Sequence, residues 1–196
     1  MGSFITFVLG GARSGKSAFA ESLAGERGRV VYIATAGAGD PEMSSRIAAH
    51  RSRRPAEWST WEGRVLSLAD EIPKIAPSYD TLLLDSLTMY LSAAMLALPE
   101  GTIEDEKVWP AEEEKILESV RDIFAAFREA AVLTDKRLIV VSDETGCGIV
   151  PCYPMGRRFR DLLGTANQIT ARAAGEAALV TAGIPLWIKT LRPEKT

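Results

Sequence analysis

Gly10-Gly-Ala-Arg-Ser-Gly-Lys-Ser17 is the stretch of sequence that decides the fold. It follows the apolar run Phe4–Leu9 and precedes a segment with helical spacing that extends to about Glu26. The stretch matches the pattern G-x-x-x-x-G-K-[ST], in which backbone N–H groups and a helix N-terminus cradle phosphate oxygens. A glycine-rich turn can match this pattern by chance, but here the strand and the helix that the pattern requires are both present. The sequence therefore predicts a nucleoside triphosphate site in which Lys16 reaches the terminal phosphates and Ser17 binds Mg²⁺.

Strand-like and helical segments alternate along the rest of the chain. Short apolar runs typical of buried strands occur at Val30–Ala34, Thr81–Leu84, Leu138–Val141 and Leu186–Lys189, and residues 58–61 can be extended. Helices are expected at about 17–26, 41–54, 64–75, 86–98, 111–132 and 157–182, with a polar surface connection at 99–110 and a loop at 143–154. This alternation predicts an α/β fold with a mainly parallel sheet and helices on both faces. No linker or repeat divides the sequence, so we expect residues 1–196 to form one domain.

Composition excludes several classes of function. The chain has 196 residues, of which 46% are hydrophobic and 25% charged, as in ordinary globular proteins. A net charge of −3 argues against a protein held to nucleic acid by its overall field. No apolar run is long enough for a membrane span and no signal-peptide pattern opens the chain, so we expect a cytoplasmic protein. With a single histidine the chain cannot form a two-histidine zinc site, and Cys147 and Cys152 are expected to be free thiols.

The charge is unevenly distributed. Residues 46–54 carry four arginines and no acid, whereas residues 99–118 carry eight acids and two lysines. From residue 146 to the end there are seven basic and three acidic residues. The small net charge therefore conceals two basic regions that could bind anions.

An acidic partner for the phosphate loop is expected at the end of a neighbouring strand. Asp85 directly follows the apolar run Leu82-Leu83-Leu84. It could hold the metal directly or through water. It could also cap a helix that starts at Ser86, a role that is compatible with metal binding.

His50 permits two interpretations. In a helix over residues 41–54, it would share one face with Met43 and Ile47, and would then be a packed side chain beside solvated arginines. Alternatively, its imidazole could attack the α-phosphate of a nucleotide and form a nucleotidyl-enzyme, while the arginines bind the triphosphate and the departing pyrophosphate. The residues alone leave both interpretations open.

Further motifs follow the phosphate loop in a fixed order. They are Tyr32-Ile-Ala-Thr35, Arg46-Ile47 with His50-Arg51, Arg54, Trp58, Glu62, Asp85 with Leu87-Thr88, Gly146-x-Gly-Ile-Val-Pro151, Phe159-Arg-Asp161 and Asn167-Gln168. Together they resemble the bifunctional adenosylcobinamide kinase/adenosylcobinamide-phosphate guanylyltransferase family from Phe7 to Lys189. The phosphate loop alone is common, whereas its combination with the R-I-x-x-H-R and G-I-V-P motifs is specific.

The resemblance implies a RecA-like P-loop domain that assembles as a homotrimer and uses GTP, ATP and Mg²⁺. Such enzymes phosphorylate the aminopropanol hydroxyl of adenosylcobinamide and then attach GMP to give adenosylcobinamide-GDP. The implied catalytic residues are His50, which becomes guanylylated, Lys16 and Asp85, and the implied metal ligands are Ser17 and Asp85. The implied nucleotide contacts are Gly10, Gly11, Ala12, Arg13, Ser14, Gly15, Lys16, Ser17, Ala34, Thr35, Arg51, Ser52, Arg53, Arg54, Glu62 and Asp85.

The chain departs from the family pattern in one region. Cys152-Tyr153-Pro154 stands where an acidic residue and an asparagine are usual, and Asp143 stands where asparagine is usual. The helix expected after this region begins with three arginines: Arg157, Arg158 and Arg160. These arginines either offer cations to an anionic substrate or form an ordinary solvated face. Two alternative functions remain open. One is an enzyme with only one of the two half-reactions. The other is a RecA-like ATPase that acts on nucleic acid or a protein partner.

Overall fold

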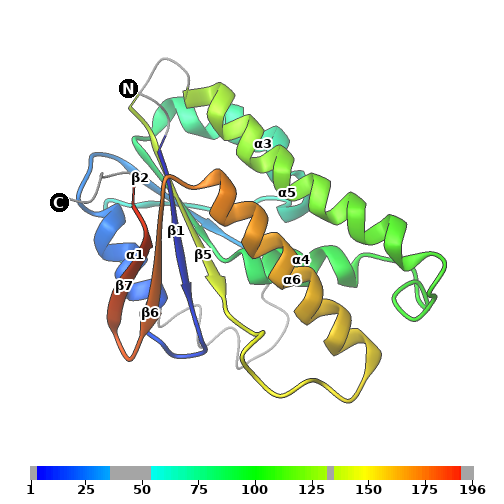
Figure 1. The fold of residues 1–196 in the computed structure, drawn as a ribbon. Coiled ribbons are helices and arrows are strands. Elements are labelled where there is room, and N and C mark those ends of the chain that lie inside the picture. The colour runs from blue at the N-terminus through cyan, green and yellow to red at the C-terminus, as the bar shows by residue number, and fades with distance from the viewer. Residues whose placement is uncertain (1–3, 36–53, 132–134, 191–196) are drawn as a thin grey trace.

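The computed structural model describes residues 4–35, 54–131 and 135–190. Their strands form one seven-stranded sheet in the order β3-β2-β4-β5-β1-β6-β7 (Figure 1). The strands are β1 (Phe4–Gly10), β2 (Val30–Ala34), β3 (Ser59–Trp61), β4 (Thr81–Asp85), β5 (Arg137–Asp143), β6 (Glu176–Thr181) and β7 (Ile184–Lys189). All neighbouring strands are parallel except β6 and β7. The mainly parallel sheet expected from the sequence is confirmed.

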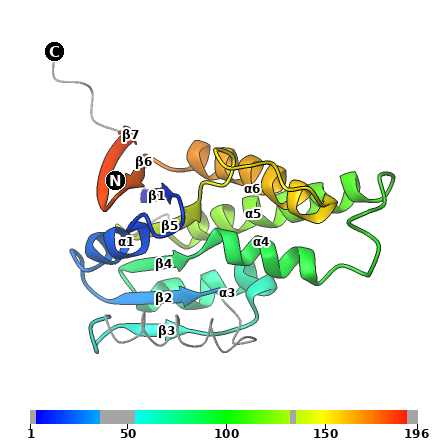
Figure 2. The same cartoon turned by 90° about the horizontal axis from the view of Figure 1, so that it is seen from below.

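Helices cover both faces of the sheet, as expected. The α-helices are α1 (Lys16–Ala24), α3 (Leu68–Ile75), α4 (Leu87–Leu96), α5 (Trp109–Ala131) and α6 (Pro154–Ala173), and short 3₁₀ turns occur at Val65–Ser67 and Ala76–Ser78. Figure 2 shows α1 on one side of the sheet and α4, α5 and α6 on the other.

The central strands are largely apolar because both faces of the sheet are buried there. Side chains alternate between the faces of a strand. In β4, Leu82 and Leu84 pack under the larger helical layer, whereas Leu83 packs in the cluster that contains Ala20 of α1. Continuous apolar runs are the expected pattern for parallel strands that are covered on both sides.

The prediction of a helix over residues 157–182 is wrong beyond Ala173. Helix α6 ends at Ala173, and the alanine-rich segment that follows enters the sheet as β6 beside β1. Ala182 and Gly183 have φ values of 52° and 80° and join β6 to β7 in a tight hairpin turn. Alanine favours helices, but the sheet has an open edge at β1, and pairing there satisfies the backbone of this segment.

The connection expected to be polar between residues 99 and 110 contributes to the core. Two of its own residues, Ile103 and Trp109, are buried. The carboxylate of Asp105 accepts hydrogen bonds from the backbone of Lys107 and Val108, immediately before α5 begins at Trp109. The long helix therefore starts two residues earlier than residue 111. The helix expected at 41–54 lies outside the described residues, except for its last residue, Arg54.

Candidate nucleotide site

The phosphate loop leaves the carboxyl end of β1 and leads directly into α1. Gly15 is the N-cap residue of α1 with a φ of 94°, and it has no side chain to occupy the first N–H groups of the helix. A Cβ atom at Gly10 would lie 2.6 Å from the carbonyl oxygen of Val180 and 2.5 Å from Oγ of Ser14. On its other side the loop is braced by the β6–β7 turn, because the N–H of Gly183 donates to the carbonyl of Ser14 at 2.8 Å. These contacts hold a backbone nest at a helix N-terminus, which is suited to phosphate.

Gly15→Ala is expected to lower the free energy of unfolding by about 1–3 kcal/mol, because a residue with a Cβ is strained at positive φ. The added Cβ would also lie 3.1 Å from the Cα of Gly183. For a chain of this size the melting temperature should fall by roughly 2–10 °C in thermal unfolding followed by circular dichroism. Gly11→Ala is the matched control for stability, because a Cβ there meets nothing within 4 Å. Equal melting temperatures for the two variants would contradict the strained geometry.

Lys16 is paired with an acid that the motif does not predict. Its Nζ lies 2.5 Å from Oδ1 of Asp143 and donates to the carbonyl of Gly11 at 3.2 Å. The side chains of Lys16 and Asp143 are only 13% and 25% exposed. The pair forms because Asp143 ends β5 in register with Gly10, which ends β1. The sequence does carry a signal for Asp143, since it follows an apolar strand as Asp85 does.

The end of β5 is fixed by side chains from two helices. The N–H of Asp143 donates to Oγ1 of Thr88 in α4 at 2.9 Å, and its carbonyl accepts from Nδ2 of Asn167 in α6 at 3.0 Å. Ser142 in turn donates to Oδ1 of Asn167 at 2.7 Å. Thr88 and Asn167 belong to motifs of the family resemblance, and in the structure they hold the backbone of Asp143 at the end of β5.

Asp85 lies at the end of β4, opposite Ala34 of β2. The hydroxyl of Tyr32 donates to its Oδ2 at 2.8 Å. Burial raises the pKa of Tyr32 far above its usual range, and the adjacent Asp85 charge adds to the rise, so the phenol remains a donor. The alternative role of Asp85 as a helix cap is wrong, because Ser86 is the N-cap of α4 and accepts from the N–H of Met89. The Asp85 carboxylate is therefore bound by Tyr32 of β2 and does not cap α4.

Thr35 joins the ends of β2 and β4. Its hydroxyl donates to the carbonyl of Ser86 and accepts from the N–H of Ser86, each at 2.7 Å. Thr35 is buried, whereas Ala34 is partly exposed. The hydroxyl of Thr35 thus positions Ser86 and the end of the Asp85 strand.

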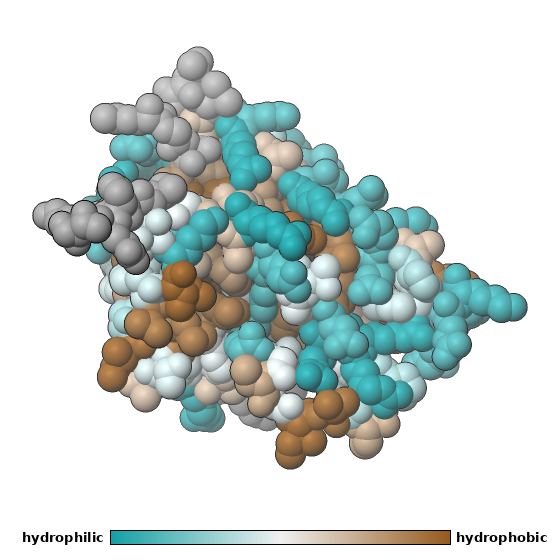
Figure 3. Space-filling view, in the orientation of Figure 1, coloured by the Kyte–Doolittle hydropathy of each residue, from teal (hydrophilic) through white to brown (hydrophobic). Residues whose placement is uncertain are grey.

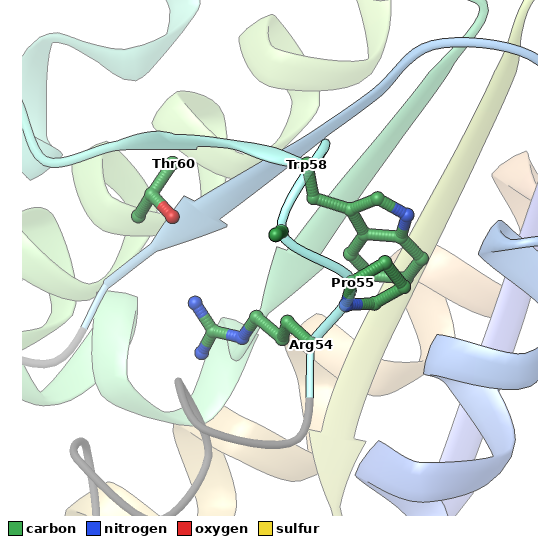
Figure 4. A pocket seen from close by; sticks show the side chains of 5 residues that line it. Arg54, Pro55, Trp58 and Thr60 are labelled. Carbon is green, nitrogen blue, oxygen red and sulfur yellow. The ribbon is translucent and has the colours of Figure 1, made fainter.

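Arg54 lies beside this edge of the sheet, where it contacts Tyr32 and lines a cavity. The guanidinium of Arg54 sits 3.1 Å above the ring of Tyr32. Arg54 also lines a cavity of about 320 Å³ together with Pro55, Ala56, Trp58 and Thr60. In Figure 4 the Arg54 guanidinium extends toward the side of Thr60, away from Trp58. Glu62 follows β3 on the surface. The Arg54 guanidinium is thus stacked on Tyr32, whose hydroxyl binds Asp85.

The other arginines of residues 46–54 lie outside the described residues, as do Ser52 and His50: Arg46, Arg51 and Arg53. Among the residues that the structure describes, no group of three or more His, Cys, Asp or Glu side chains could hold a metal ion. None of the described helices is both long and apolar enough to cross a membrane.

The basic start of α6 holds the preceding loop. Arg157 donates to the carbonyls of Pro151 and Cys152, Arg160 donates to the carbonyl of Gly146, and Arg158 lies over the ring of Trp109. The loop exposes Ile149 almost completely, with Val150 half exposed beside it. In Figure 1 this yellow segment lies at the same lower edge of the molecule as the phosphate loop, and Figure 3 shows an apolar patch there.

The order of the parallel strands and the loop at the end of β1 place the chain among the P-loop nucleotide-binding α/β proteins. That class contains many activities, and sequence comparison narrows it. The chain belongs to the cobinamide kinase / cobinamide phosphate guanyltransferase family, whose model matches residues 6–188. The family resemblance inferred from the motifs is thus confirmed, and the chain is an enzyme of this family.

Three relatives align along nearly their full lengths. The bifunctional adenosylcobalamin biosynthesis protein CobP of Pseudomonas aeruginosa is 40% identical over 183 residues, which cover 93% of this chain and 95% of the relative. The bifunctional adenosylcobalamin biosynthesis proteins CobU of Salmonella typhimurium and Escherichia coli are 39% and 37% identical, each covering 93% of this chain and 98% of the relative.

Proposed function

We propose that this chain phosphorylates adenosylcobinamide on its aminopropanol hydroxyl and then transfers GMP from GTP to the product, giving adenosylcobinamide-GDP. The observation that carries the proposal is the phosphate loop around Lys16, in a chain that matches bifunctional relatives over 93% of its length. ATP or GTP donates the phosphoryl group in the first reaction.

In the kinase step the enzyme stabilises the negative charge that spreads over the transferred phosphoryl group. Lys16 and the first N–H groups of α1 bind the phosphate oxygens, with Arg13 and Ser14 shaping the loop. Asp85 orients the acceptor hydroxyl.

Ser17 and Asp85 fit a role in holding Mg²⁺. A hydroxyl and a carboxylate are hard oxygen donors, and Mg²⁺ commonly takes one or two such ligands together with phosphates and water. Tyr32 binds one oxygen of Asp85, and within the described part of the chain the other oxygen is left for a cation. When bound, the ion supplies positive charge that neutralises the phosphates.

The guanylyl transfer proceeds through His50. An imidazole nitrogen attacks the α-phosphorus of GTP, an N–P bond forms, the bond to the β-phosphate oxygen breaks and pyrophosphate leaves. A phosphate oxygen of adenosylcobinamide phosphate then attacks the same phosphorus, the N–P bond breaks and His50 is regenerated. Arg51, Ser52, Arg53 and Arg54 bind the triphosphate, and Glu62 accepts hydrogen bonds from guanine or ribose. The stacking of Arg54 over Tyr32, beside Asp85, supports this arrangement.

GTP labelled at the α-phosphate tests the proposal. The protein is expected to acquire label that is stable to alkali and labile to acid, as a phosphoramidate is, and to pass it to adenosylcobinamide phosphate. A protein that phosphorylates adenosylcobinamide but acquires no label would be an enzyme with only the kinase half-reaction. An ATPase rate stimulated by nucleic acid, without transfer to the corrinoid, would instead support the RecA-like ATPase.

We also propose that residues 1–196 act as one cytoplasmic domain that assembles as a homotrimer. The seven described strands share one sheet, which supports the single domain. The outer strand β7 exposes Ile184, Leu186 and Ile188, and Figure 3 shows this apolar surface at the lower left. An apolar edge strand of this kind is suited to an interface between copies.

The assembly can be measured by light scattering coupled to size exclusion. The expected mass is about three times that of the 21.2 kDa chain. Leu186→Lys should shift the mass toward the monomer, whereas Leu66→Lys, at an exposed leucine away from β7, should leave the mass unchanged. A monomeric wild-type protein would contradict the trimer.

A further inference from the structure

The acid that pairs with the phosphate-loop lysine has no role in the mechanism above. We propose that Asp143 makes this site select the magnesium complex of a nucleoside triphosphate over the metal-free nucleotide, by competing with the phosphates for Lys16. The inference rests on the proposed function, because it concerns the nucleotide site of that function.

The first support is the pair of contacts that Lys16 makes. Its ammonium group has a carboxylate at 2.5 Å and a carbonyl at 3.2 Å, from Asp143 and Gly11. Both side chains of the ion pair are mostly buried, so solvent screens the pair only partly. A phosphate that approaches Lys16 must therefore share the ammonium group with Asp143.

The second support is that Asp143 has little freedom to withdraw. Its backbone is bound on one side by Thr88 and on the other by Asn167. The residue also ends a buried strand that is paired on both sides. The backbone of Asp143 is consequently held beside the phosphate loop, and its carboxylate remains within reach of Lys16.

The third support is the second carboxylate at the same edge. Asp85 pairs in register with Val141, two residues before Asp143 on the adjacent strand. A metal-free triphosphate thus meets negative charge from both Asp85 and Asp143, and like charges at close range repel strongly in a partly buried site. A divalent cation bound with the nucleotide offsets this repulsion. Asp143 therefore contributes to the coupling between cation and nucleotide.

The experiment measures binding of a non-hydrolysable triphosphate by calorimetry, with excess Mg²⁺ and with EDTA. In Asp143→Asn, the affinity for the metal-free nucleotide should rise about tenfold, and the affinity for the magnesium complex should change less than about threefold. Asp143→Ala, which removes the same charge together with the contact to Lys16, should likewise raise the affinity for the metal-free nucleotide more than the affinity for the magnesium complex. Unchanged or weaker metal-free binding in both variants, at an unchanged melting temperature, would overturn the inference.

Two controls separate this inference from the proposed function. Asp135→Asn removes the same charge before the opposite end of β5, from an exposed pair with Arg27, and should leave both affinities unchanged. Lys16→Ala should weaken binding of both nucleotide forms. If Lys16→Ala binds as tightly as the wild type, the nucleotide site itself is misplaced and the proposed function falls with it. If Lys16→Ala weakens binding while Asp143→Asn changes nothing, only the role of Asp143 is overturned.

Discussion

Lys16→Ala is expected to reduce phosphorylation of adenosylcobinamide by about a thousandfold or more, the scale seen when a catalytic cation is missing from phosphoryl transfer. The substitution removes the one ammonium group that the structure places within the phosphate loop at Gly11. It also leaves Asp143 without its cation, so that the carboxylate repels the incoming phosphates. Transfer of label from γ-labelled ATP to the corrinoid measures the rate.

A surface lysine provides the matched control for this variant. Lys74 pairs with Glu71 on the exposed side of α3, and Lys74→Ala should keep the wild-type rate. Comparable melting temperatures for the two variants exclude unfolding as the cause of any loss. A Lys16→Ala enzyme that phosphorylates at the wild-type rate would refute the role of the loop.

His50→Ala is expected to abolish guanylyl transfer while phosphorylation continues. Loss of a nucleophile that forms a covalent intermediate lowers the rate by about a thousandfold or more. The separation is expected because the proposed kinase step uses Lys16 and Asp85, which the substitution leaves in place. With α-labelled GTP the variant should acquire no label on the protein, and with γ-labelled ATP it should still produce labelled adenosylcobinamide phosphate.

The two readouts make the His50 prediction specific. Label retained on His50→Ala would assign the covalent bond to another residue. Loss of both half-reactions, with an intact melting temperature, would show that the segment around His50 also serves the kinase step. Together with Lys16→Ala, the pair of variants distinguishes a bifunctional enzyme from one that retains a single half-reaction.

Most of the sheet could be predicted from the sequence, because strands buried on both faces are written as continuous apolar runs. β1, β2, β4 and β5 are all of this kind. The alanines of β6 favour a helix and carry no β-branched signal, and it is pairing with β1 on one side and β7 on the other that makes this segment a strand. The Ala182-Gly183 pair between two apolar runs was the local indication of a hairpin.

The candidate site, like the sheet, has a part that the sequence predicts and a part that it does not. Lys16, Ser17 and Asp85 follow from a local motif and from their places at strand ends. The pairing of Lys16 with Asp143 depends on the register of β1 against β5, which joins residues far apart in the chain. The hydrogen bonds between Ser86 and Thr35 likewise depend on how β2 and β4 align. Such contacts are properties of the assembled sheet rather than of any one segment.

The hydrogen bond between Gly183 and Ser14 gives the last hairpin of the sheet a place in the nucleotide site. Whatever shifts the turn between β6 and β7 also shifts a carbonyl of the phosphate loop. If copies of the chain meet along β7, the hydrogen bond from Gly183 to Ser14 links the interface to the phosphate loop. Nucleotide binding would then change the association constant of the copies by the same factor by which assembly changes the affinity for the nucleotide. The edge of the molecule that meets a neighbouring copy is then also a support of its phosphate site.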